Sequence, residues 1–138
     1  MKLTLNKRLL LGCFFYSLLS ANCLAFKTKS IDDCEKRFDT ADELSRCLDV
    51  VKEATDRELQ TWINNQVFIL EEFSLSTGRT SSLTMFKRSQ RNFISYRENN
   101  CRWQYLHLSP NKMAASAFKK CYILTTSDRI KELSRLNK

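Results

Sequence analysis

One stretch, residues 90–101, limits the possible folds more than any other part of the chain. If it forms a helix, with successive residues about 100° apart, four side chains fall on its inward side. They are an amide, an aromatic ring, a guanidinium and a thiol, from Gln90, Phe93, Arg97 and Cys101. A buried arginine needs a carboxylate, because an unpaired buried charge is strongly destabilising. A buried cysteine in an exported chain is usually paired with another. The rest of the chain must therefore supply an acid and a thiol.

Glycine and proline are scarce, with 2 Gly and 1 Pro among 138 residues. This composition argues against the many tight turns of a β-sandwich or barrel. A capping box at Thr40 and Glu43 predicts the start of a first helix. Apolar residues then recur every three or four positions to about Leu75, and Gly78 follows as a stop signal. The predicted inward positions of this helix are Leu48, Val51, Thr55, Glu58 or Leu59, Trp62, Gln66, Ile69 and Phe73.

Two further helices are predicted after the glycine. The second covers residues 82–108. Ser109 and Pro110 then predict the start of a third, which extends to about Leu136, because serine caps helices well and proline fits the first helical position. The predicted fold class is all-α: an antiparallel three-helix hairpin or bundle with a long first helix and two disulfides. It forms a single domain over residues 26–138.

Residues 1–25 have the features of a cleavable signal peptide. Lys2, Lys7 and Arg8 precede an apolar run from Leu9 to Leu19 that is too short to span a bilayer. Small residues follow, and cleavage is expected after Ala25. An uncleaved anchor and a lipoprotein modified at Cys23 are the alternatives. Removal of this segment leaves 20 of the 23 Lys and Arg against 15 Asp and Glu, a net charge of +5. The expected location is the periplasm, or the outside, of a bacterial cell.

The carboxylate partner of Arg97 can be sought across the first turn. If the first two helices pack antiparallel about Gly78, Glu58 lies level with Arg97. We therefore predict a buried Glu58–Arg97 ion pair. Asp56 is the alternative partner, although it projects toward the edge of the helix. In a third alternative, Arg97 extends its head group to solvent.

Four cysteines remain in the mature chain: Cys34, Cys47, Cys101 and Cys121. Four cysteines in a small exported domain indicate two disulfides, and counting alone allows three pairings. Folding about the second turn brings Cys101 opposite Cys121, while Cys34 and Cys47 flank the helix start at Thr40. The predicted pairing is therefore 34–47 and 101–121. A zinc site is not expected, because the chain has no CxxC pair and a single histidine.

Three blocks of residues resemble the LprI-type lysozyme-inhibitor family. They are Asp56-Arg57-Glu58-Leu59, then Gln90-x-x-Phe93-x-x-Tyr96-Arg97-x-x-x-Cys101, then Thr126-x-x-Arg129-x-x-Glu132-Leu133, together with Cys34, Cys47 and Cys121. The chain departs from the family at Phe93, where tryptophan is usual, at Gln60, where asparagine is usual, and at Ile63, where tyrosine is frequent. The resemblance implies a small exported helical domain of the bacterial envelope that inhibits lysozyme. It provides no inhibitory motif, and the matching positions are expected to be scaffold.

No set of residues predicts catalysis or a bound cofactor. Glu71 and Glu72 are adjacent, so they point about 100° apart and do not form an acid–base pair. His107 has no nucleophile evident beside it in the sequence. Disulfide-bonded cysteines are not nucleophiles. We therefore expect a binding protein and not an enzyme.

Charge patterns suggest two kinds of partner. Lys87, Arg88, Arg91 and Arg102 lie among aromatic residues. Export makes nucleic acid an improbable ligand, and anionic lipid or acidic glycan a better one. An envelope protein that binds such a surface without inhibiting lysozyme is the alternative function. Lysozyme, or another envelope or host protein, is the partner implied by the family. The expected docking region for a basic enzyme is an acidic cluster: Asp32, Asp33, Glu35, Asp39, Asp42 and Glu43.

Overall fold

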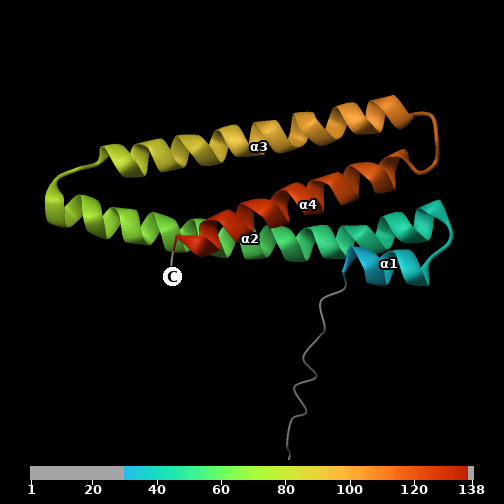
Figure 1. Ribbon diagram of the computed structural model, residues 1–138, viewed down its shortest axis with the longest axis horizontal. Coiled ribbons are helices and arrows are strands. Elements are labelled where there is room, and N and C mark those ends of the chain that lie inside the picture. Colours follow the sequence, from blue (N-terminus) through green and yellow to red (C-terminus); the bar gives the residue numbers. More distant parts are fainter. Residues whose placement is uncertain (1–29, 137–138) are drawn as a thin grey trace, which may run out of the picture.

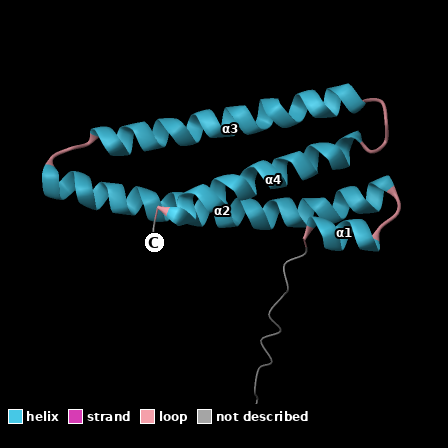
Figure 2. Cartoon of the chain, viewed as in Figure 1, coloured by secondary structure: helices cyan, strands magenta, loops and turns pink. Residues whose placement is uncertain are grey.

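A computed structural model describes residues 30–136, which form helices and no strands. The helices are α1 (Ile31–Arg37), α2 (Ala41–Thr77), α3 (Ser81–Leu108) and α4 (Ala114–Arg135), as Figures 1 and 2 show. The all-α class is thus confirmed, but the described residues contain four helices and not three. The expected signal peptide, residues 1–25, lies outside the described residues, as does the expected domain start at residue 26.

Helix α1 was not predicted, because the segment before Thr40 is short and polar. It begins with a capping box. The Ser30 hydroxyl accepts from the Asp33 amide at 3.0 Å, and the Asp33 carboxylate accepts from the Ser30 amide at 3.0 Å. Asp32 and Asp33 also place negative charge at the helix N-terminus, which is favourable. The hydroxyl-to-acid spacing that predicts a helix start at Thr40 therefore also occurs ten residues earlier, at Ser30.

Helix α2 begins and ends where its local signals predict. The Thr40 hydroxyl accepts from the Glu43 amide at 3.4 Å and donates to the Glu43 carboxylate at 2.6 Å. The helix ends at Gly78, whose φ of 71° lies in the left-handed region. A side chain would be strained in that conformation, so glycine is the suitable stop residue.

The start of α4 differs from the prediction. Ser109 is the C-cap of α3, and α4 begins at Ala114 and not at Pro110. Asn111 explains the difference, because it closes a turn before the helix. Its carbonyl accepts from the Ala114 amide at 3.0 Å, and its side-chain oxygen accepts from the Met113 amide at 2.8 Å. The chain therefore uses these residues to reverse direction before α4 begins.

Helix α4 lies between the other two long helices over much of its length (Figure 1). It runs parallel to α2 and antiparallel to α3. Two apolar clusters hold it in place. The first consists of Cys34, Leu44, Cys47, Leu48, Val51 and Ile123. The second consists of Leu59, Ile130 and Leu133, with Trp62, Ile63, Phe86 and Phe93 packed against them. Because α4 supplies part of each cluster, α2 and α3 do not form a simple two-helix zipper.

Polar contacts fix the register of α4. Lys119 donates to the Ser45 carbonyl at 3.1 Å, to the Ser45 hydroxyl at 2.7 Å and to the Asp49 carboxylate at 2.7 Å. Its neighbour Lys120 forms an ion pair with Glu35 of α1 at 2.7 Å. One end of α4 is thereby attached to both α2 and α1.

Two disulfides join the helices with the predicted pairing. Cys34–Cys47 links α1 to α2, and Cys101–Cys121 links α3 to α4. Cys34 and Cys101 are fully buried. Among the described residues, no helix combines the length and the hydropathy needed to cross a bilayer.

Two of the predicted inward positions of α2 are wrong. Ile69 and Phe73 are about 40% exposed, at 42% and 40% respectively. The helical period places them on the same side as Leu59 and Trp62. They lack cover because α4 ends at Arg135, before it reaches them (Figure 1).

Candidate functional site

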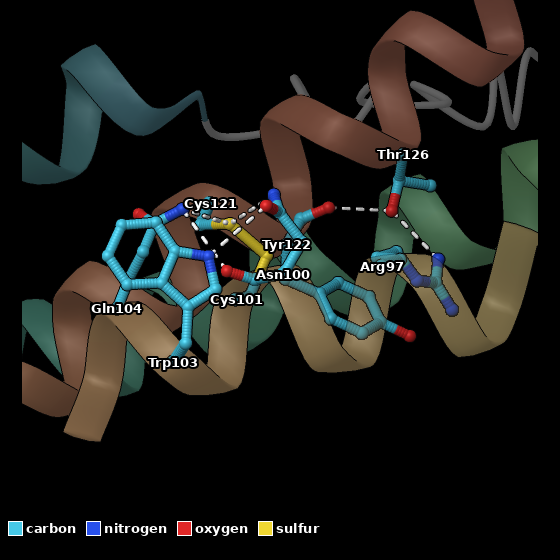
Figure 3. Close-up of a disulfide and its surroundings, with 8 residues drawn as sticks. All are labelled: Arg97, Asn100, Cys101, Trp103, Gln104, Cys121, Tyr122 and Thr126. Carbon is cyan, nitrogen blue, oxygen red and sulfur yellow. Dashed lines mark hydrogen bonds between the residues drawn. A yellow bond between two sulfur atoms is a disulfide. The ribbon is translucent and has the colours of Figure 1, made fainter. Parts of the chain in front are cut away.

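A buried guanidinium joins all three long helices. Arg97 of α3 has a side chain only 8% exposed. Its Nη1 donates to Asp56 of α2 at 3.1 Å and to the Thr126 hydroxyl of α4 at 2.8 Å. Its guanidinium carbon lies 3.8 Å from the centre of the Tyr122 ring (Figure 3). Lys52 also forms an ion pair with Asp56, at 3.2 Å. The cluster therefore links the three long helices through one carboxylate that two cations share.

The predicted partner Glu58 is wrong, and the alternative Asp56 is correct. Glu58 is exposed, whereas Asp56 faces Arg97. Residues two apart on a helix project about 200° apart, so only one of these acids can face α3. Helix α4 occupies the space above Leu59, and Arg97 therefore approaches α2 from one flank. Asp56 lies on that flank and Glu58 on the other.

A second arginine lies close to the first. Arg129 of α4 forms a 2.6 Å ion pair with Glu132. It also donates to the Gln90 side-chain oxygen at 3.4 Å and to the Ser89 hydroxyl at 3.2 Å. Both guanidinium groups lie near the Phe93 ring, whose centre is 5.4 Å from the central carbon of Arg97 and 5.7 Å from that of Arg129. This assembly attaches the middle of α3 to α4.

Most of the residues that carry the family resemblance take part in contacts between the helices, although Arg57, Glu58 and Glu132 have exposed side chains. Asp56, Leu59, Gln90, Phe93, Arg129 and Glu132 take part in the two arginine clusters or in the adjoining core. Tyr96 does not, because its side chain is 59% exposed. These contacts support the expectation that the motif is scaffold.

Burial raises the pKa of the Tyr122 hydroxyl above its ordinary value of 10.0, while the nearby charge of Arg97 acts in the opposite direction. Above pH 10 the unfolded chain therefore loses this proton before the folded chain does. Stability then falls as the pH rises, by at most about 1.4 kcal/mol per pH unit. We expect the free energy of unfolding to fall less between pH 9 and pH 11 in Tyr122→Phe than in the wild type. Denaturant titrations at both pH values measure this difference, and equal losses would contradict it.

The other residues considered for chemistry lie apart. Glu71 pairs with Lys87 of α3 at 3.3 Å, Glu72 is exposed on α2, and His107 is exposed near the end of α3. The described residues contain no group of three or more His, Cys, Asp or Glu side chains arranged to hold a metal ion. An open hollow between α1, α2 and α4 is lined by residues such as Ile31, Val51 and Ile123.

The acidic cluster lies at the α1 end of the molecule, and half of it has local roles. Asp33 and Glu43 cap their helices, and Glu35 pairs with Lys120. The remaining acids, Asp32, Asp39 and Asp42, are exposed. We call this the acidic end, although Lys36 and Arg37 of α1 also lie there. The opposite end, at the turn between α2 and α3, carries exposed basic and apolar side chains together with the acids Glu71 and Glu72.

Trp103 lies beside the Cys101–Cys121 disulfide (Figure 3). Trp103 is 56% exposed and donates to the Asn100 side-chain oxygen at 3.3 Å. On the other side of α3, Arg102 forms a 2.6 Å ion pair with Glu98. The predicted basic stripe on α3 is therefore partly neutralised at this end, and its free charges lie toward the first half of the helix.

In a comparison with protein-family models, the model described as lysozyme inhibitor LprI matches residues 32–133. The matched span contains both disulfides and both arginine clusters. No curated protein and no solved structure matches the chain.

Proposed function

Because the chain belongs to the LprI lysozyme-inhibitor family, we propose that it is an exported protein that binds a lysozyme in the bacterial envelope and blocks its action on the cell wall. The observation that carries this proposal is the family match over residues 32–133, which covers almost all of the described fold. The match is supported by the contacts of the motif residues, because they form the scaffold and leave the exposed surface free to bind.

The disulfides support the proposed location. Such bonds persist in oxidising compartments, which include the periplasm and the cell exterior, and are rare in the cytosol. Both bonds join separate helices, so the folded shape depends on that environment. Lysozyme acts on the cell wall, so a protein in the periplasm or outside the cell would be in the same compartment as this enzyme.

We expect the protein, purified from the periplasm with its disulfides formed, to slow lysozyme with half-maximal inhibition at or below about 1 μM, because standard-sized interfaces give affinities from micromolar to picomolar. The assay follows lysozyme turnover on cell-wall substrate and, in parallel, on a soluble uncharged oligosaccharide. The second substrate matters because a basic protein could coat an anionic cell wall and mimic inhibition. Reduced and alkylated protein serves as the unfolded control.

Unchanged turnover of the soluble substrate at micromolar excess and low salt, across lysozymes of several structural types, would contradict the proposal. In that case, binding to anionic vesicles that weakens with added salt would favour the alternative function. That alternative is an envelope protein that contacts anionic lipid or glycan and has no inhibitory activity.

A further inference from the structure

The α2–α3 turn is carried on a projecting arm, which we define as residues 67–88. Helix α4 ends at Arg135, whereas α2 and α3 continue past it to meet at Gly78 (Figure 1). The last core cluster that α4 joins contains Leu59 and Leu133. Phe86 at the base of the arm still packs against this cluster, and beyond it the hairpin arm consists of two helices without the third. This is a thin, protruding element attached to a disulfide-linked body.

The hairpin arm exposes several large apolar side chains. Five large apolar side chains are at least 40% exposed there: Phe68 (63%), Ile69 (42%), Phe73 (40%), Leu75 (81%) and Met85 (58%). Ile69 and Phe73 continue the stripe that α4 covers further along α2. Grouped apolar side chains on a soluble protein mark an interaction surface.

The acids of the arm, Glu71 and Glu72, lie on α2, and the charges that follow them along the chain are all basic. From Phe73 to Arg97 the chain has five basic residues and no acidic one. Lys87 is paired with Glu71 of α2, and Arg97 is buried in the scaffold. The other three, Arg79, Arg88 and Arg91, are exposed and form no ion pair among the described residues. They are available to a partner's carboxylates.

We propose that the hairpin arm is the inhibitory element and that it enters the substrate cleft of lysozyme, an inference that rests on the proposed function. Glycosidases of this type hold two carboxyl groups on either side of the bond that they cleave, so their clefts are acidic at the centre. Arg79, Arg88 and Arg91 complement that charge. The apolar side chains of the arm contact the cleft walls, and the arm thereby excludes the glycan strand.

The distribution of apolar residues favours a cleft over a flat surface. On α2, Phe68 and Leu75 project roughly 130° away from Ile69 and Phe73. A planar membrane would contact one of these pairs and leave the other in water. A cleft has two walls and can cover both pairs at once. The acidic end of the molecule lies at the far end of the rod and would face away from the bound enzyme.

The test compares two matched triple variants of the exported protein. Arg79→Gln, Arg88→Gln and Arg91→Gln remove the exposed cations, whereas Asp32→Asn, Asp39→Asn and Asp42→Asn neutralise the acidic end. We expect the first to raise the inhibition constant by about 30-fold and the second to change it by less than about 2-fold. All six residues are exposed, so circular dichroism should match the wild type. Thermal unfolding should also match for the arginine variant, whereas the acidic-end variant should be slightly less stable because Asp32 and Asp42 lie in the first turns of their helices. A further variant, Phe68→Gln with Leu75→Gln, should weaken inhibition by about 10-fold.

A second measurement tests the location on the enzyme. A chito-oligosaccharide that fills the lysozyme cleft should compete with the wild-type protein, and the apparent affinity should fall in proportion to cleft occupancy. Formation of a ternary complex of enzyme, oligosaccharide and inhibitor would overturn the proposal.

The possible failures are distinguishable. If wild-type protein neither binds nor inhibits lysozyme, the proposed function fails and the arm proposal fails with it. A second outcome is that the arm variants inhibit as well as the wild type while the acidic-end variant does not inhibit. The proposed function then stands, and the arm proposal is overturned. If the arginine variant loses binding to phosphatidylglycerol vesicles but inhibits normally, the arm binds membranes and the proposal is again overturned.

Discussion

We expect Asp56→Ala to lower the free energy of unfolding by about 3 kcal/mol and Glu58→Ala to change it by less than about 0.5 kcal/mol. The reason is the location of Arg97, whose side chain is 8% exposed and is enclosed by Tyr122 and Thr126. Without Asp56 its charge would remain buried with a single neutral oxygen as partner. Asp56 itself is 34% exposed, so solvent screens part of the attraction. We therefore place the loss at the lower end of the range for broken buried pairs.

Denaturant unfolding followed by circular dichroism at neutral pH measures both variants. The m-value should stay constant, because the surface exposed on unfolding is the same. Asp56→Asn is a matched control that keeps the size of the side chain and one acceptor oxygen, and it should lose less than Asp56→Ala. Equally small losses in Asp56→Ala and Glu58→Ala would mean that Arg97 reaches solvent when its partner is removed. A large loss in Glu58→Ala would mean that Glu58 is the true partner.

Replacing both Cys101 and Cys121 by serine should destabilise the protein by about 3 kcal/mol, because the unfolded chain gains the entropy of an open 20-residue loop. The bond joins α3 to α4, and Arg97 lies one helical turn from Cys101. Separation of these helices would therefore also weaken the buried ion pair. Global unfolding measured by denaturant, with the wild type in its oxidised form as reference, gives the size of the loss.

The other disulfide is the matched control. Its 13-residue loop gives nearly the same entropy, about 3 kcal/mol. However, Cys34–Cys47 attaches only α1, a helix of 7 residues, to the start of α2. Without the bond we expect α1 to open locally, with fast amide exchange over residues 30–38, and the global loss to be smaller than for Cys101 and Cys121. Equal global losses with unchanged exchange in α1 would contradict this view.

The candidate surfaces were only partly predictable from sequence. The acidic cluster was visible as a run of charge, but Asp33 and Glu43 cap helices and Glu35 pairs with Lys120. The sequence shows how many acidic residues the cluster has, but not which of them are already paired with a cation or cap a helix. The exposure of the hairpin arm was not predicted from the sequence. Ile69 and Phe73 have the period of core residues, and nothing within α2 indicates that its cover ends earlier.

The sequence by itself determined the helical class, the ends of α2 and the disulfide pairing. These features depend on local chemistry: a hydroxyl that caps at Thr40, a left-handed residue at Gly78, and cysteines that flank a chain reversal. The tertiary structure alone decided that Arg97 pairs with Asp56 and that α4 does not cover the hairpin arm. Both outcomes depend on where α4 lies and how far it extends. A helix presents several flanks with similar residues, and only the position of a third helix determines which flank is buried and which remains exposed.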